Sequence, residues 1–232
     1  MLIDNPLKPL VRWMGGKQRL LGPILDTIYE SKYTGTYIEP FLGGGSVLLA
    51  LLPNRAVIND LNGQLVNLWR CVQSDVEAVI DCWNEINTDP VTSDHYYQLR
   101  DEHNEYRRND TSGPRAAAVF AWITRHSFNG LYRTRKDGTV NANWNKEEQS
   151  RPLPVDNWRE VHRYLRNNDI LILQGDFDRV VKMAGGGIWC IVILPMPSVL
   201  KRKRIPRLFT VDSMCSPIQN GSRRFYLIAP RR

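Results

Sequence analysis

The spacing of apolar positions changes along the chain and predicts an alternation of helices and strands. Leu20, Leu21, Ile24, Leu25 and Ile28 fall on one face of a helix. Short apolar runs then end at Glu39 and near Asp60, and each is followed by a turn and a helical pattern. Two strand–turn–helix units in succession predict a parallel, doubly wound α/β sheet.

Residues 75–127 lose the strand signal and become helical, charged and aromatic, and Asp137-Gly138 then predicts a hairpin. A helix from about Asn157, the apolar strand DILILQ, a further helix and an apolar run over residues 188–194 resume the alternation. No helical or strand periodicity follows Leu200. We therefore expect residues 1–74 and 151–200 to form one core, with an insert at 75–150 and a tail at 201–232.

The basic charge of the chain is concentrated in that tail. The net charge is +7, yet residues 201–232 alone carry +8 and residues 1–200 carry −1. The charge of the body therefore gives no argument for nucleic-acid binding. No apolar run could cross a bilayer and the N-terminus lacks a secretion signal, so we expect a cytoplasmic protein. The four cysteines, none of them in a C-x-x-C pair, predict reduced thiols and no metal site.

The glycine run Gly43–Gly45 lies between a predicted strand and a predicted helix, and Asp60 lies 17 residues beyond Gly43. This order is typical of a site for an adenosine-containing cofactor, whose ribose hydroxyls an acidic side chain accepts. The alternative is a plain tight turn. No Lys-Ser/Thr follows the glycines, and Glu39 would repel a phosphate but could receive a cationic group.

Several motifs in one order, over about residues 7–190, resemble those of the Dam-type DNA adenine-N6 methyltransferases. These motifs are RWMGGK, YIEPFLGGGSVLL, INDLNGQLVNLW, RHSFNGLYR and GDF. The resemblance implies a Rossmann-like sheet with a helical DNA-recognition insert and S-adenosylmethionine as cofactor. It assigns to the cofactor Trp13, Gly15, Gly16, Lys17, Glu39, Pro40, Phe41, Gly43, Gly44, Gly45, Asp60, Asp176 and Phe177. By themselves, Trp13 reads as a core residue and Lys17 as a solvated one.

The resemblance also places DNA contacts in the insert, at Arg125, Phe128, Asn129, Leu131 and Arg133. An aromatic side chain at the Phe128 position wedges beside the target base pair, which fits the need to flip a base before its amine can be methylated. The alternative is that Phe128, Asn129 and Leu131 pack the insert. The hairpin departs from the family pattern in VNANWN and the following Lys146-Glu147-Glu148, so the recognition sequence, commonly GATC in relatives, is not predicted. We expect double-stranded DNA as the partner, no membrane, no metal and a monomer.

The family's catalytic motif, Asp-Pro-Pro-Tyr, is absent in frame. Its place holds IWCIVILPMP, and the motif is expected near Val192, Ile193, Leu194, Pro195 and Met196. When the last base of each codon is joined to the first two of the next, residues 187–197 can spell Asp-Leu-Val-Tyr-Cys-Asp-Pro-Pro-Tyr-Ala. We therefore expect a frameshift near Gly185–Gly187, no intact catalytic residue, an out-of-frame tail, and the last strands of the sheet to be missing.

Three functions follow as hypotheses. The first is a site-specific DNA adenine-N6 methyltransferase by descent, inactive as written. The second is a catalytically dead remnant that still binds cofactor or DNA. The third is an unrelated nucleotide-binding protein.

Overall fold

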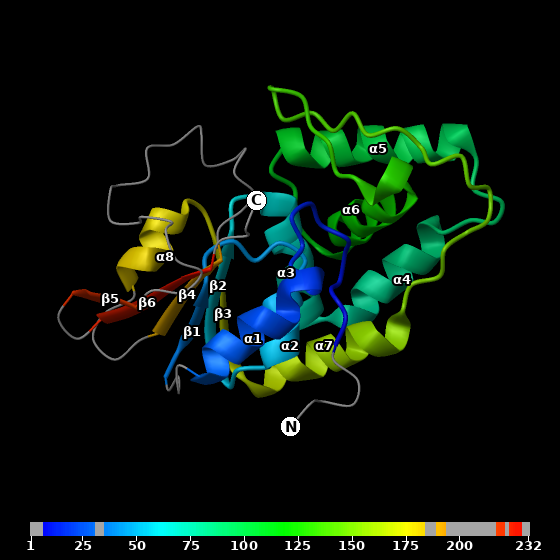
Figure 1. The fold of residues 1–232 in the computed structure, drawn as a ribbon. Helices are drawn as coiled ribbons and strands as arrows, with labels where there is room; N and C mark the ends of the chain where they lie inside the picture. Colours follow the sequence, from blue (N-terminus) through cyan, green and yellow to red (C-terminus); the bar gives the residue numbers. More distant parts are fainter. Residues whose placement is uncertain (1–6, 31–34, 184–188, 194–216, 221–222, 229–232) are drawn as a thin grey trace. The chain divides into compact units, whose positions relative to one another are not determined.

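The computed structural model describes residues 7–30, 35–183, 189–193, 217–220 and 223–228 (Figure 1). The chain divides into two compact units. The helical unit comprises Met1–Gly16, Gly43–Gly45 and Asn62–Asn167, and the sheet unit comprises Lys17–Leu42, Ser46–Leu61 and Asn168–Arg232. The helices at 63–74 and 155–167, on either side of the expected insert, belong to the helical unit.

The sheet unit contains a six-stranded sheet in the order β3-β2-β1-β4-β6-β5. All neighbouring strands are parallel except β5 and β6, which are antiparallel. Because β2 and β3 lie on one side of β1 and β4 on the other, the order reverses at β1, where ligands of open α/β sheets bind. The strands are β1 (Tyr37–Glu39), β2 (Arg55–Asp60), β3 (Asp169–Gln174), β4 (Trp189–Ile193), β5 (Pro217–Asn220) and β6 (Arg223–Ile228).

Helices cover this sheet where the apolar spacing predicts them. A short turn, η1 (Gln18–Leu20), leads into α1 (Leu21–Glu30), which buries Ile24 and Ile28. Helix α1 contacts α2 (Ser46–Leu51), and α8 (Phe177–Met183) contacts β2. The predicted strand ends at Glu39 and Asp60, and the parallel α/β sheet itself, are confirmed.

The helical unit is organised around one buried helix, α6, which contacts α3, α4 and α5. The run AAAVFAWIT makes α6 apolar on all sides, and Pro114 starts it without a lost hydrogen bond. Side chains of Asn62, Asp75 and Thr92 cap the starts of the three other helices in this group. The helices are α3 (Gly63–Ser74), α4 (Val76–Ile86), α5 (Ser93–Arg108), α6 (Pro114–His126) and α7 (Val155–Asn167).

The predicted hairpin is confirmed in a reduced form. Thr134 and Val140 make a single antiparallel bridge, and Gly138 takes a positive φ of 85° at the turn. This turn spans more than the two residues that Asp137-Gly138 by itself suggests.

The structure differs from our expectation after Leu200. We expected the last strands of the sheet to be missing, whereas β5 and β6 extend the sheet beyond β4. The reason is that β6 contains the run RRFYLI, whose aromatic and β-branched residues favour a strand, and pairing uses backbone groups that any sequence supplies. Among the described residues, no helix is long and apolar enough to cross a membrane.

Candidate cofactor site and nucleic-acid interface

Asn59, near the end of β2, makes hydrogen bonds to the turns that follow β1 and β3. Its side-chain amide donates to the carbonyl oxygens of Pro40 and Gly175, each at 3.0 Å. The backbone carbonyl of Asn59 accepts from the N–H of Leu42 at 2.8 Å. Asn59 is 1% exposed, so these bonds are shielded from water. The ends of β1, β2 and β3 are thereby held at one edge of the sheet. We did not predict this role for Asn59, although a polar residue before the strand-end carboxylate was a visible signal.

Glu39 is a buried carboxyl group at this edge. It is 3% exposed, and the hydroxyl of Tyr37 donates to its Oε2 at 3.0 Å. Burial raises the pKa of Glu39 to about 8, against the opposing effects of the Tyr37 bond, the backbone N–H of Leu48 and the charge of Lys17. Burial likewise lowers the pKa of the Lys17 ammonium, which Glu39 partly restores. At neutral pH the carboxyl group holds a proton, which an entering cation would displace.

Two aromatic rings and a second carboxylate complete the edge. The rings of Phe41 and Phe177 lie 5.2 Å apart between centroids, so the turns after β1 and β3 meet. Asp60 ends β2 and is half-buried, and its carbonyl accepts from the N–H of Gly175 at 3.1 Å. Asp176 accepts from the N–H of Asp178 at 3.2 Å and so caps α8. The edge can therefore offer flat apolar walls to a ring and carboxylates to hydroxyl or amino groups.

The glycine run belongs to the helical unit, where two tryptophans require it. Gly43 and Gly45 have φ values of 54° and 76°. A Cβ atom at Gly45 would lie 2.4 Å from the ring of Trp69, and one at Gly43 would lie 2.9 Å from Trp13. The indole N–H of Trp69 donates to the carbonyl of Gly43 at 3.1 Å. Packing alone thus explains why glycine is needed here.

Trp13 joins an aromatic cluster of the same unit. Its ring centroid lies 5.8 Å from that of Phe120 in α6 and 5.3 Å from that of Tyr132. It is only partly buried. These contacts agree with the interpretation of Trp13 as a packing residue.

The expected DNA contacts gather at the end of α6. Phe128 begins the turn η2 (Phe128–Gly130) and is 55% exposed, so it does not pack the insert. Asn129 has a φ of 56°, which few non-glycine residues adopt, and Leu131 is half-buried. Arg133 is exposed. An exposed aromatic ring on a constrained turn suits a wedge between base pairs.

Arg125 lies in the last turn of α6 beside a second arginine. Burial, and then the charge of Arg151, lower the pKa of its guanidinium. Arg151 donates to the Arg125 carbonyl at 2.9 Å and to the Glu147 carboxylate at 2.7 Å. The negative charge of Glu147, one of the residues at which the hairpin departs from the family pattern, is therefore paired within the unit.

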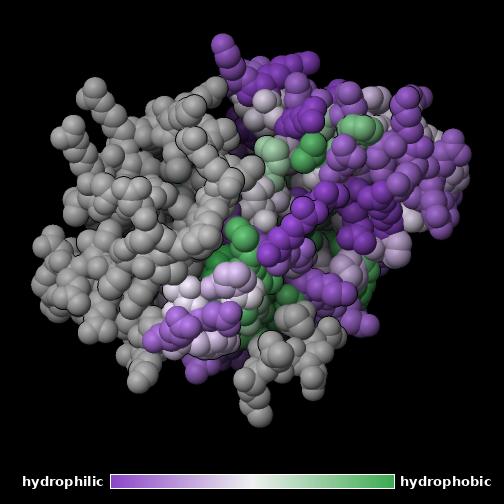
Figure 2. Space-filling model, in the orientation of Figure 1, coloured by the Kyte–Doolittle hydropathy of each residue, from purple (hydrophilic) through white to green (hydrophobic). Residues whose placement is uncertain are grey.

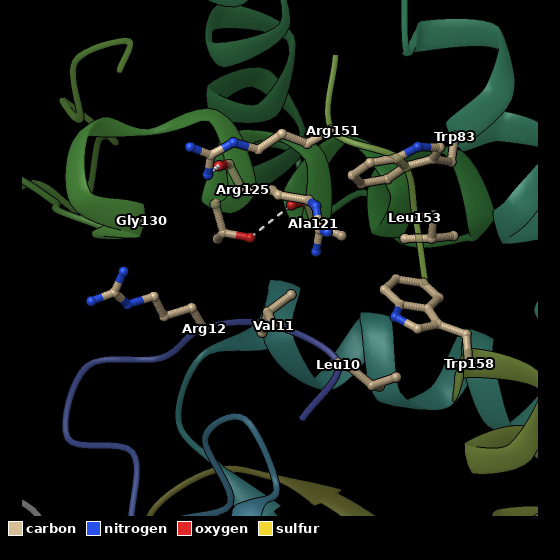
Figure 3. Close-up of a pocket in the computed structure, with 11 residues that line it drawn as sticks. Leu10, Val11, Arg12, Trp83, Ala121, Arg125, Gly130, Arg151, Leu153 and Trp158 are labelled. Atoms are coloured by element: carbon tan, nitrogen blue, oxygen red, sulfur yellow. Dashed lines mark hydrogen bonds between the residues drawn. The ribbon is translucent and has the colours of Figure 1, made fainter. Parts of the chain in front are cut away.

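A pocket of about 260 Å³ lies in front of these arginines (Figure 3). Arg12 and Arg151 line it at one end, Trp83, Leu153 and Trp158 line the other end, and Arg125 lies between them (Figure 3). The stem of Arg12 passes over the turn, since a Cβ atom at Gly130 would lie 2.9 Å from its Cδ. The pocket thus combines an apolar wall with three cations.

The positions expected for the catalytic motif are only partly described. Val192 and Ile193 end β4, with backbone described but not side chains, and Leu194, Pro195 and Met196 lie outside the described residues. Among the described residues, no group of three or more His, Cys, Asp or Glu side chains is placed to hold a metal ion.

Comparison with known proteins identifies the family. The model of the D12 class N6 adenine-specific DNA methyltransferases matches residues 13–188. The chain is 32% identical over 181 residues to the type II methyltransferase M1.LlaDCHI of Lactococcus lactis subsp. cremoris, covering 78% of this chain and 63% of that protein. It is 30% identical over 187 residues to M.MjaIII of Methanocaldococcus jannaschii, covering 75% and 64%.

A DNA adenine methylase of Serratia marcescens is 31% identical over 137 residues, covering 58% of this chain and 48% of that protein. The chain thus spans less than two thirds of the length of these relatives. An unrelated nucleotide-binding protein, our third hypothesis, is excluded. The chain belongs to the D12 class of N6 adenine-specific DNA methyltransferases.

Proposed function

We propose that this chain descends from a site-specific enzyme that transfers a methyl group from S-adenosylmethionine to the N6 amine of a flipped adenine in duplex DNA. The observation that carries the proposal is the family match over residues 13–188, which takes in both the sheet edge and the insert. The relatives are named as type II methyltransferases and DNA adenine methylases.

The sheet edge supplies groups that could bind S-adenosylmethionine. The buried carboxyl of Glu39 would receive the amino group of the methionine part, and Asp60 would accept the ribose hydroxyls. Phe41 and Phe177 would wall the adenine, with Asp176 beside them. The cofactor supplies the activated methyl group. The roles that the resemblance gives to Trp13, Gly15, Gly16, Lys17, Pro40, Gly43, Gly44 and Gly45 stay predictions.

The end of α6 would engage the DNA. Phe128 is exposed on a turn held by left-handed backbone at Asn129 and Gly130, so its ring could enter the base stack without repacking the core. Arg125 and Arg133 would contact phosphates and bases, and Asn129 and Leu131 would flank the wedge. The flipped adenine would then be presented for transfer.

We infer that the chain as written does not complete the transfer. In the family motif, the aspartate and a proline carbonyl accept hydrogen bonds from the adenine amine and aim its nitrogen at the methyl group, and the tyrosine stacks on the base. No residue from Val192 to Met196 supplies a carboxylate. A frameshift near Gly185–Gly187 accounts for this, and the family match ending at residue 188 supports it. The alternative is a remnant that binds cofactor or DNA without turnover.

The nucleotide sequence of codons 185–197 tests the frameshift directly. The alternate frame needs the Ile193 codon to be ATC, because its final C begins the first proline codon. Any other isoleucine codon at that position refutes the frameshift.

A methylation assay on adenine-containing duplex DNA then tests the function, with protein purified from a host that lacks adenine methylases. We expect no transfer by the chain as written and transfer after one base is inserted near codons 185–187. A variant in which only residues 201–232 are deleted controls for the removal of the basic tail. Equal turnover by the uncorrected and corrected chains would refute the frameshift account, and turnover by neither would favour the remnant.

A further inference from the structure

Helix α5 carries a row of polar side chains toward the recognition segment, which we define as residues 127–145. Tyr96, Arg100, His103, Asn104 and Arg107 recur at helical spacing and so share one face of α5. Amphipathic helices ordinarily pack an apolar stripe. In this one, His103 and Asn104 are 0% and 6% exposed, so polar groups form part of the packed surface.

The recognition segment has little pairing of its own. Within the described residues it contains no strand, and its ladder consists of two isolated bridges, Ser127 with Trp144 and Thr134 with Val140. A two-stranded hairpin is at best marginally stable in water. Its geometry therefore depends on what it packs against.

The polar face of α5 supplies the missing bonds. Asn104 pairs with both backbone groups of Val140: its Oδ1 accepts from the N–H at 2.8 Å and its Nδ2 donates to the carbonyl at 3.2 Å. The side-chain amide thus takes the place of a neighbouring strand. Both residues are buried, Val140 at 1% exposure, so water does not compete for these bonds.

Tyr96 joins the two ends of the segment. Its ring is fully buried, and its hydroxyl donates to the carbonyl of Ala142 at 3.1 Å and lies 3.0 Å from Oγ of Ser127. Ser127 immediately precedes Phe128, whose N–H bonds the carbonyl of Asn143 at 2.7 Å. One hydroxyl group therefore fixes the start of the turn that carries Phe128 relative to the returning chain.

Further contacts extend this row along the helix. Arg100 donates to the Ala142 carbonyl at 3.3 Å, and Nε2 of His103 lies 2.9 Å from the hydroxyl of Tyr132. The guanidinium of Arg107 lies against the hairpin turn, because a Cβ atom at Gly138 would be 2.6 Å from it. Nε of Arg100 and Nδ1 of His103 are buried without a hydrogen-bond partner. The polar side-chain atoms of Tyr96 and Asn104 all have partners, and buried polar groups that are satisfied in this way favour a single geometry. Most of the face of the molecule in the region of α5 is hydrophilic, with a few small hydrophobic patches (Figure 2).

We propose that the polar face of α5 is a splint for the recognition segment, and that Tyr96 and Asn104 are positioning residues that set the exposed ring of Phe128 and the guanidinium of Arg133 for duplex DNA. Neither Tyr96 nor Asn104 needs to touch the DNA. The proposal rests on the proposed function only for the identity of the ligand, since the splint itself is a property of the free protein.

The test compares Tyr96→Phe with Tyr97→Phe in the full chain. The two substitutions remove the same atom from neighbouring positions of α5, but within the described residues the Tyr97 hydroxyl makes no hydrogen bond. In Tyr96→Phe we expect backbone amides of residues 128–145 to exchange about 10-fold faster than in the wild type, and amides of α3 and α7 to be unchanged. Asn104→Asp, which sets a buried carboxylate oxygen against the Val140 carbonyl, should speed exchange in the same segment at least as much.

Duplex binding provides the second measurement. We expect Tyr96→Phe to weaken duplex affinity roughly 3- to 10-fold relative to Tyr97→Phe, with the same dependence on salt, because the arginines that meet phosphates are retained. Equal exchange rates in Tyr96→Phe and Tyr97→Phe would refute the splint, as would a loss of protection spread over the whole helical unit. Faster exchange with unchanged affinity would refute the positioning role. If neither the wild type nor Tyr97→Phe binds duplex DNA, the proposed function fails, and the exchange rates still decide whether the splint exists.

Discussion

Replacing Gly45 by alanine should destabilise the helical unit by about 2–5 kcal/mol. A Cβ atom there would stand 2.4 Å from two ring carbons of Trp69, which is fully buried and bonded to Gly43. The ring cannot move aside without disturbing the core, and such overpacking costs about 1–3 kcal/mol. The φ of 76° adds roughly 1–2 kcal/mol for an L-residue in left-handed backbone.

Urea unfolding followed by tryptophan fluorescence measures this loss. Six of the seven tryptophans belong to the helical unit, so the signal reports that unit. The matched control is Gly113→Ala in the same unit, where φ is 117° but no atom lies within 4 Å of the added Cβ; we expect it to lose only the roughly 1–3 kcal/mol of backbone strain. If Gly45→Ala stays within about 0.5 kcal/mol of the wild type, the packing argument for this glycine is wrong.

Three further predictions concern the sheet edge. Asp60→Ala should weaken S-adenosylmethionine binding by about 1.5–3 kcal/mol in calorimetry, and an unchanged affinity would place the cofactor elsewhere. The pKa of Glu39 is about 8 in the folded protein and about 4.5 in the unfolded chain, so the folded state binds more protons between these values. The free energy of unfolding should therefore fall from pH 5 to pH 8, and it should fall less in Glu39→Gln. The same pH dependence in the two proteins would contradict the buried state of Glu39. Asn59→Ala leaves the carbonyl oxygens of Pro40 and Gly175 without this donor, and should lower the free energy of unfolding in urea by about 1–3 kcal/mol. Asn54→Ala, at an exposed position, should lower it far less.

The local pattern of apolar and turn residues was enough to predict the strands and helices that carry the candidate cofactor site. The strand ends at Glu39 and Asp60 and the helices that follow them were predictable, because apolar spacing and turn residues act over a few positions. The order of the motifs along the chain was likewise enough to predict the family. The strands β5 and β6, which follow Leu200, were not predictable in this way, because they pair with each other and with β4 through backbone groups.

Tertiary structure alone decided how the polar residues are used. Tyr96, Arg100 and Asn104 have the spacing of a solvated helical face, and only the folded chain turns that face toward the backbone of Val140 and Ala142. The sequence alone gives no sign that the pKa of Glu39 differs from that of an ordinary glutamate. Burial in the folded protein raises it. Sequence determines which groups a segment can offer, but desolvation and pairing depend on residues far away in the chain, so their chemistry is fixed only when the chain folds.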